Sequence, residues 1–247
     1  MRFADPPIEG RLVRRYKRFL ADVELPQGEV VVAHCPNTGS LLGCKEQGSR
    51  VWLRDSRDPR RKLRYTWQAI RVGRTWVNVD TSLPNRVVRE ALQAGCVPEL
   101  SGYEEVRREV PYGRASRIDL LLEGDGRPSC YVEVKSTTLA RGPAGLFPDA
   151  VTTRGLKHLE ELARVARRGL RAVQFFLVGR DDVECFRPAD DIDPDYGRAL
   201  RRAARAGVEL MAWTVRVEPH GIDLHRALEI ELPPLPARKR RARRRKA

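Results

Sequence analysis

The pattern of hydrophobic and polar positions changes once along the chain, near residue 83. Before that point, short β-branched and aromatic runs alternate with polar residues, a pattern typical of half-buried strands. These runs lie at residues 11–25, 28–35, 49–55, 65–72 and 75–81. Gly73 and Arg74 separate the last two runs as a tight hairpin turn would. The pattern predicts a small β-barrel, and we expect an OB-like barrel, although an SH3-like barrel has the same pattern.

After residue 83, helical and strand patterns alternate. Asn85 is placed to cap a helix at residues 86–94, which Gly95 would end. Further strands are predicted at residues 104–112, 116–124, 129–137, 171–179 and 208–218, and helices at 155–168 and 193–207. This order predicts a mixed α/β domain around a central sheet. The nearly continuous apolar run at 171–179 predicts a strand buried on both faces.

The charge is unevenly distributed along the 247 residues, which contain 47 Lys+Arg and 33 Asp+Glu for a net charge of +14. Positive charge gathers in the first 85 residues and at 238–247, while the middle is near neutral. Clusters of Lys and Arg attract polyanions, so DNA is the expected partner. We therefore expect a basic, nucleic-acid-binding barrel over residues 1–82, an α/β domain over 83–236 and a disordered basic tail over 237–247.

Several protein classes are excluded by what the sequence lacks. No apolar run reaches the roughly 18–20 residues of a membrane span, and the first residues lack the apolar region of a signal peptide. We expect a cytoplasmic protein, nucleoid included, with no membrane partner. The five cysteines show no C-x-x-C pair or zinc spacing, which argues against a disulfide framework or a zinc module. Cys96 and Cys130 stand in apolar surroundings and are expected in the core.

The strongest chemical signal is a group of charges within two predicted strands. Asp119 interrupts an apolar strand, and Glu133 and Lys135 leave the same face of the next strand. A Gly-Asp-Gly turn at 124–126 would join these strands as a hairpin and bring the carboxylates together. Solvent-facing charges on a surface strand give the same E-x-K spacing, but a charge among apolar neighbours, as at Asp119, needs a partner or a metal.

This group predicts a metal-dependent phosphodiester site. Asp119 and Glu133 would hold Mg²⁺ or Mn²⁺, because hard cations prefer oxygen ligands. The cation would polarise a phosphodiester. Lys135 would offset the charge that develops on the phosphate, or hold the attacking water.

The order of these elements resembles the PD-(D/E)xK nuclease fold, a helix with a carboxylate followed by strand–Asp–strand–E-x-K–helix. The resemblance implies that Glu90 orients the metal or its water shell. It also implies that Lys157 and His158 of the following helix lie near the phosphate. Ile118, not proline, precedes the aspartate, a departure that the superfamily tolerates.

The whole chain resembles the sugar fermentation stimulation protein family over about residues 1–232. Nine blocks carry the resemblance in order: RRYKRFLADV (14–23), HCPNTGSLLGC (34–44), RRKLRYTW (60–67), LPNRVVREAL (83–92), ELSGY (99–103), SRIDLLL (116–122), YVEVKSTTL (131–139), FPDAVTTRGLKHLEEL (147–162) and GVELMAW (207–213). The resemblance implies an N-terminal OB-like domain followed by a restriction-endonuclease-like, PD-(D/E)xK-type α/β domain. It also implies DNA binding linked to the regulation of sugar (maltose) utilisation genes.

Basic residues outside this group are candidates for DNA contact. They are Arg14, Arg15, Lys17, Arg18, Arg61, Lys62 and Arg117. Phe19 lies beside the first cluster and would stack on bases or pack in the core, and the core is the favoured prediction. For Arg61 and Lys62 a solvated loop is an equal alternative.

Two further residues have open roles. Arg117, close to Asp119, would approach a phosphate or pair with a carboxylate. Asp149 would cap the following helix or lie at the entrance of the site.

Three functions follow from these predictions. The leading one is a DNA-binding protein with a metal-dependent, endonuclease-type core. The alternative is a non-catalytic transcriptional regulator of sugar utilisation genes, but acidic residues facing phosphate repel it without a metal. The third is a small-molecule or sugar sensor in the barrel. The oligomeric state stays open, with a homodimer among the options.

Overall fold

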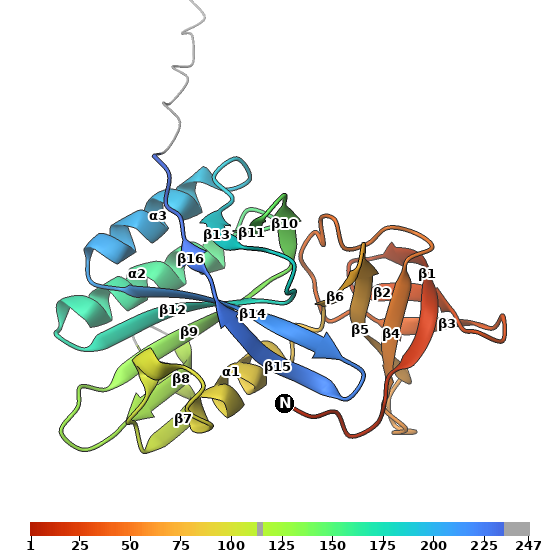
Figure 1. Ribbon diagram of the computed structural model, residues 1–247, viewed down its shortest axis with the longest axis horizontal. Coiled ribbons are helices and arrows are strands. Elements are labelled where there is room, and N and C mark those ends of the chain that lie inside the picture. The colour runs from red at the N-terminus through yellow and green to blue at the C-terminus, as the bar shows by residue number, and fades with distance from the viewer. Residues whose placement is uncertain (113–115, 235–247) are drawn as a thin grey trace, which may run out of the picture.

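Two β-rich domains pack side by side in the computed structural model, which describes residues 1–112 and 116–234 (Figure 1). The predicted basic tail at 237–247 lies outside the described residues.

The N-terminal domain is a closed OB barrel, as the alternating pattern predicted. Its strands are β1 (Ile8–Tyr16), β2 (Leu20–Glu24), β3 (Val30–His34), β4 (Arg50–Asp55), β5 (Tyr65–Val72) and β6 (Thr75–Asn78). The order β3-β2-β1-β4-β5 is closed by an additional β3–β5 pairing, and β6 extends the sheet beyond β5. Gly73 forms the predicted hairpin turn between β5 and β6 with a φ of +57°, which glycine adopts without strain.

The C-terminal domain is built on a mixed sheet in the order β15-β14-β12-β9-β8-β7. The strands and helices after the barrel are α1 (Pro84–Gln93), η1 (Pro98–Leu100), β7 (Glu105–Tyr112), β8 (Ser116–Glu123), β9 (Cys130–Thr137), β10 (Leu139–Arg141), β11 (Ala144–Phe147), α2 (Thr153–Arg167), β12 (Arg171–Val178), β13 (Cys185–Pro188), α3 (Pro194–Arg205), β14 (Glu209–Glu218), β15 (Gly221–Ala227) and β16 (Glu229–Ile230). Figure 1 shows α1 on one side of this sheet and α2 and α3 on the other. In the described part of the chain, no helix is long and apolar enough to cross a bilayer.

Strand β12 forms the centre of this domain and is buried on both faces, as predicted. It pairs in parallel with β9 on one side and with β14 on the other. Val173 and Phe175 pack into the core beneath α1, while Ala172 and Phe176 pack into the core beneath α2 and α3. Because successive side chains of a strand alternate between faces, one apolar run supplies both cores.

Two predictions about local structure were wrong, and five strands were missed. Helix α1 begins one residue before the predicted cap, with Pro84 at its first position, so Asn85 lies inside the helix and does not cap it. Strands β10, β11, β13, β15 and β16 were not predicted. Cys130 is buried as expected, but Cys96 is exposed, because it lies just after the end of α1.

The two domains share a tightly packed interface. The indole rings of Trp52 and Trp76 stack with centroids 3.9 Å apart, and Trp52 belongs to the core that lies beneath α1. The backbone N–H of Asn78 donates to the carbonyl of Gly179 at 2.7 Å. A Cβ at Gly179 would lie 2.8 Å from the carbonyl oxygen of Asn78, so only glycine permits this approach. The barrel is therefore held against the α/β domain by direct contacts.

Candidate functional site

Asp119 lies where strand β8 separates from strand β9. The pairing of these strands ends at Leu120, opposite Val132. Beyond it, the Asp119 carboxylate accepts the backbone N–H of Val134 on Oδ2 at 2.8 Å. Its Oδ1 accepts Nδ2–H of Asn85 on α1, also at 2.8 Å. The sequence interpretation missed this contact because asparagine at the start of a helix is a common capping residue.

Glu133, on β9, is held by a lysine of the same strand and by a histidine of α2. Its Oε1 accepts Nζ–H of Lys135 at 2.7 Å and contacts Nδ1 of His158, on α2. Arg154 Nε–H donates to His158 Nε2 at 3.4 Å, which leaves the imidazole proton on Nδ1, where it points to Glu133. The structure thus brings together three predicted site residues, because β9 presents two of them toward the helix that carries the third.

The surroundings move the pKa values of the two carboxyl groups in opposite directions. Burial, reinforced by the negative charge of Glu133, raises the pKa of Asp119. Burial also acts to raise the pKa of Glu133, but the hydrogen bond from His158 and the charge of Lys135 outweigh it, so that pKa is lowered. Such divergence between neighbouring acids is typical of catalytic pairs.

Two tyrosines, the half-buried Tyr112 and the fully buried Tyr196, are affected by the charge of Glu133 and were missed by the sequence interpretation. Burial, together with the charge of Glu133, raises the pKa values of Tyr112 and Tyr196. The hydroxyl groups of both are buried without a hydrogen-bond partner among residues 1–112 and 116–234. Each tyrosine stands in an ordinary amphipathic pattern, so the sequence offered no signal that would separate it from a core residue.

The residues present fit a weakly chelated divalent cation. The side chain of Glu133 is only 2% exposed, and its Oε2 has no hydrogen-bond partner among the described residues. A buried carboxylate oxygen of this kind calls for a positive ligand. Across residues 1–112 and 116–234, no three His, Cys, Asp or Glu side chains converge in metal-ligating positions. A cation here would therefore take its remaining ligands from water and phosphate, the habit of Mg²⁺.

Glu90 and Lys157 lie apart from this group. Glu90 forms an ion pair with Arg86 at 2.7 Å and contacts the amino group of Met1 at 3.5 Å. It lies five positions beyond Asn85 on α1, about 140° around the helix from the residue that reaches Asp119. Lys157 is exposed on α2, whereas the next residue points inward. The predicted roles of Glu90 and Lys157 stay predictions, and this placement argues against both.

Among the predicted DNA contacts of the barrel, three are already bonded to the protein. Arg15 directs Nη2 to the carbonyl oxygens of Arg18, Asn37 and Gly39, each at 2.8 Å. Arg14 pairs with Asp22. Arg61 donates to Thr66 at 3.4 Å. The remaining barrel candidates are exposed: Lys17, Arg18 and Lys62. Arg117, on β8 of the α/β domain, is exposed as well.

Phe19 is a clear departure from the predicted core position. Its side chain is 49% exposed, because it lies in the turn that connects β1 to β2 and the barrel interior begins only at Ala21. The turn therefore presents an aromatic ring beside two exposed cations, Lys17 and Arg18.

Asp149 fastens the two domains together. Its Oδ2 accepts the backbone N–H of Leu41 at 2.9 Å, and its carbonyl accepts the hydroxyl of Ser40 at 2.5 Å. The cap of α2 is Thr152, whose side chain accepts the N–H of Gly155. The capping role considered for Asp149 thus belongs to Thr152.

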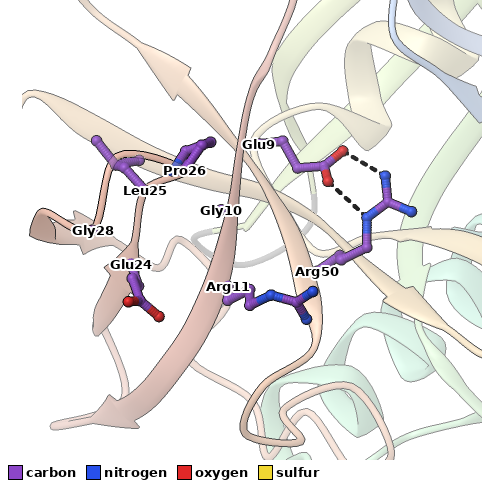
Figure 2. A pocket seen from close by; sticks show the side chains of 8 residues that line it. All are labelled: Glu9, Gly10, Arg11, Glu24, Leu25, Pro26, Gly28 and Arg50. Carbon is purple, nitrogen blue, oxygen red and sulfur yellow. Dashed lines mark hydrogen bonds and ion pairs between the residues drawn. The ribbon is translucent and has the colours of Figure 1, made fainter.

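A cavity of about 310 Å³ lies on the barrel between β1, the turn after β2 and the start of β4 (Figure 2). Glu9 and Arg50 line it and pair through two hydrogen bonds of 2.7 Å. Glu24 and Arg11 add one charge of each sign, so the lining has no net positive charge. This balance does not favour a polyanion, and the charged lining is unlike the mostly apolar walls of typical small-ligand sites.

Comparison with known proteins supports the two-domain reading. Residues 13–79 match the family model described as "SfsA N-terminal OB domain", and residues 82–221 match "Sugar fermentation stimulation protein RE domain". The chain is 53% identical over 233 residues to a sugar fermentation stimulation protein homolog of Maricaulis maris, covering 94% of this chain and 99% of the relative. It is 54% identical over 225 residues to the homolog of Geobacter sulfurreducens, covering 91% and 96%.

A solved structure has the same fold. It is described as "The structure of Pyrococcus Furiosus SfsA in complex with Ca2+" and superposes with a TM-score of 0.86 at 29% identity, covering 94% of this chain and 98% of that one.

Proposed function

Because the chain belongs to the sugar fermentation stimulation protein family, we propose that it binds DNA and cleaves phosphodiester bonds with the help of a divalent cation. The observation that carries this proposal is the pair of carboxylates at Asp119 and Glu133, with the buried, unpaired Oε2 of Glu133 among the described residues. The relative from Pyrococcus furiosus was solved with Ca²⁺, a hard cation that also takes oxygen ligands, which supports the binding of a divalent cation by this chain.

Asp119 and Glu133 would hold the cation, which when bound polarises the scissile phosphate and offsets its negative charge. Asp119 is oriented for this by the N–H of Val134 and the amide of Asn85, each of which leaves its acceptor oxygen a second lone pair. The contact from His158 fixes Glu133 in one rotamer and keeps it ionised.

Lys135 would stabilise the charge that develops on the phosphate. Its ammonium group lies 2.7 Å from Glu133 Oε1, so its position is set before a substrate arrives. With a side chain only 14% exposed, it acts where water screens its charge weakly. DNA would be drawn to the site by the exposed basic residues of the barrel.

The test is incubation of plasmid, linear duplex and single-stranded DNA with Mg²⁺, with Mn²⁺ and with EDTA. We expect cation-dependent cleavage by the wild type and its loss in Glu133→Gln and in Lys135→Ala. Glu160→Gln is the matched control, because Glu160 is an exposed carboxylate on α2, the helix that carries His158. Glu90→Gln tests the role predicted for that residue from the sequence.

Two outcomes would refute the enzymatic part of the proposal. Cleavage that persists in Glu133→Gln would come from a contaminant. Binding of DNA without cleavage under any cation would leave the non-catalytic DNA-binding regulator as the better description.

A further inference from the structure

The turn between β1 and β2 consists of Lys17, Arg18 and Phe19, and its backbone is strained. Tyr16 pairs with Leu20 at the end of the ladder, so three residues reverse the chain. Lys17 and Arg18 have φ angles of +48° and +64°, in the left-handed region that glycine adopts readily and other residues avoid. Strain retained in this way is most common at ligand-binding and catalytic sites.

The same turn is held rigidly while its aromatic ring faces solvent. Arg15 Nη2–H donates to the carbonyl of Arg18, and the N–H of Cys35 donates to the carbonyl of Phe19, both at 2.8 Å. The Phe19 side chain is nevertheless 49% exposed. A ligand that packs on this ring would therefore not have to order the backbone beneath it.

The charges of the turn are available to a ligand. Lys17 and Arg18 are exposed, and neither forms an ion pair within residues 1–112 and 116–234. The neighbouring cation Arg14 is already bonded to Asp22, which also accepts the hydroxyl of Tyr16. The turn thus combines one open aromatic face with two cations, and a single-stranded nucleic acid is the polyanion that offers unstacked aromatic faces between its phosphates.

We propose that this turn is a single-strand contact, in which Phe19 stacks on one unpaired base and Lys17 and Arg18 bind the flanking phosphates. The inference rests on the proposed DNA-binding function and deepens it, because it names the form of DNA that the barrel prefers. A duplex is a poorer ligand, since its bases are stacked on each other and show only their edges in the grooves.

The turn is tied to the interface between the two domains. Arg15 also binds the carbonyl oxygens of Asn37 and Gly39, which belong to the next barrel loop. Asn37 lines a cavity of about 160 Å³ that Ser136 and Asp149 also line, and Ser136 directly follows Lys135 in β9. A strand that is held on Phe19 is thereby attached to the loop that lines this cavity between the two domains.

The experiment measures the affinity of the full chain for fluorescein-labelled oligothymidylate, for the same oligomer with abasic positions, and for a duplex of equal length, in EDTA. Phe19→Ala and Phe19→Leu should weaken binding of oligothymidylate by about 5- to 150-fold, the range for loss of one base–aromatic stack. Phe19→Trp should retain that affinity, and none of the three should alter duplex binding. Thermal melting of each variant confirms folding, which the exposure of the ring favours.

A charge variant tests the phosphate contacts independently. Lys17→Ala combined with Arg18→Ala should lower the slope of log affinity against log salt by about 1.4, since each single-strand phosphate contact contributes about 0.7. The matched control is Arg11→Ala, an exposed cation within β1 and outside the turn.

The outcomes separate this inference from the proposed function. If the wild type binds and cleaves DNA but Phe19→Ala and Phe19→Leu bind oligothymidylate like the wild type, the inference alone is overturned. If Phe19→Leu binds oligothymidylate like the wild type while Phe19→Ala does not, apolar contact without aromatic stacking is enough for binding, and the inference that Phe19 stacks on a base is wrong. If the wild type binds no DNA in any form, the proposed function fails as well.

Discussion

Arg15 was predicted to contact DNA, but its hydrogen bonds indicate that it stabilises the barrel, and this difference can be tested. The sequence places it among four cations that were predicted to contact DNA, whereas its guanidinium faces three backbone carbonyls. The perturbation is Arg15→Ala, which removes these bonds and leaves the half-buried carbonyls of Asn37 and Gly39 short of a donor.

The magnitude follows from the bonding geometry. One Nη2 nitrogen carries two protons, so the three carbonyls share the equivalent of two hydrogen bonds from a charged donor. A hydrogen bond to a charged group contributes about 1.5–3 kcal/mol, and water recovers part of this at a half-buried position. We therefore expect Arg15→Ala to lower the free energy of unfolding by about 2–4 kcal/mol, a large share of the 5–15 kcal/mol typical of a domain.

The assay is urea unfolding followed by tryptophan fluorescence, for which the fully buried Trp67 reports on the barrel. Arg14→Ala is the matched control, because Arg14 is the adjacent cation, 69% exposed, and its pair with Asp22 should contribute about 0–1 kcal/mol. Equal urea midpoints for the two variants would refute the reasoning and return Arg15 to the DNA-binding set.

Three further predictions concern the domain contact, the strained turn and the thiols. Asp149→Ala should lower the free energy of unfolding by about 1–3 kcal/mol in urea titrations, because it leaves the buried N–H of Leu41 without an acceptor; an unchanged midpoint would contradict this. Arg18→Gly should raise the melting temperature, with a gain of up to about 1 kcal/mol, since glycine accepts a φ of +64° without strain; a lower melting temperature would speak against strain. Burial raises the pKa of Cys44 to about 11, so its thiol stays protonated at mildly alkaline pH. A thiol-alkylating reagent should therefore label the exposed Cys96 first, and Cys96→Ser should remove this fast phase of labelling.

The order of the main strands and helices could be predicted from the sequence because buried positions recur with the period of the element that carries them. Alternation marks the barrel strands, and the unbroken apolar run of β12 marks a strand that lies between two cores. The strands that were missed, such as β16 with two residues, are too short for any period. Their pairing depends on which segments the tertiary structure brings alongside them.

The site was predictable only where a charge contradicts its local pattern. Asp119 and Glu133 stand out because apolar residues surround them. Asn85, by contrast, suits both a helix cap and a ligand of a carboxylate, and the sequence does not say at which residue the helix begins. Arg15 and Lys17 carry the same charge in one segment, and only the folded position of the loop at 37–39 shows that the first is bonded inward and the second is not.

The loop at 37–41 links the two proposals mechanically. On one side Arg15 bonds it to the turn that carries Phe19, and on the other side Asp149 bonds its Ser40 and Leu41 to the α/β domain. The distance between this turn and the two carboxylates, Asp119 and Glu133, is therefore set by hydrogen bonds and not by a flexible linker. It follows that a strand anchored on Phe19 would present one particular phosphate to Asp119 and Glu133, and cleavage would fall at a constant distance from the anchored base. Loosening the loop with Asp149→Ala should then spread the cleavage positions on an end-labelled strand without abolishing cleavage. Phe19→Ala should remove the preferred position altogether.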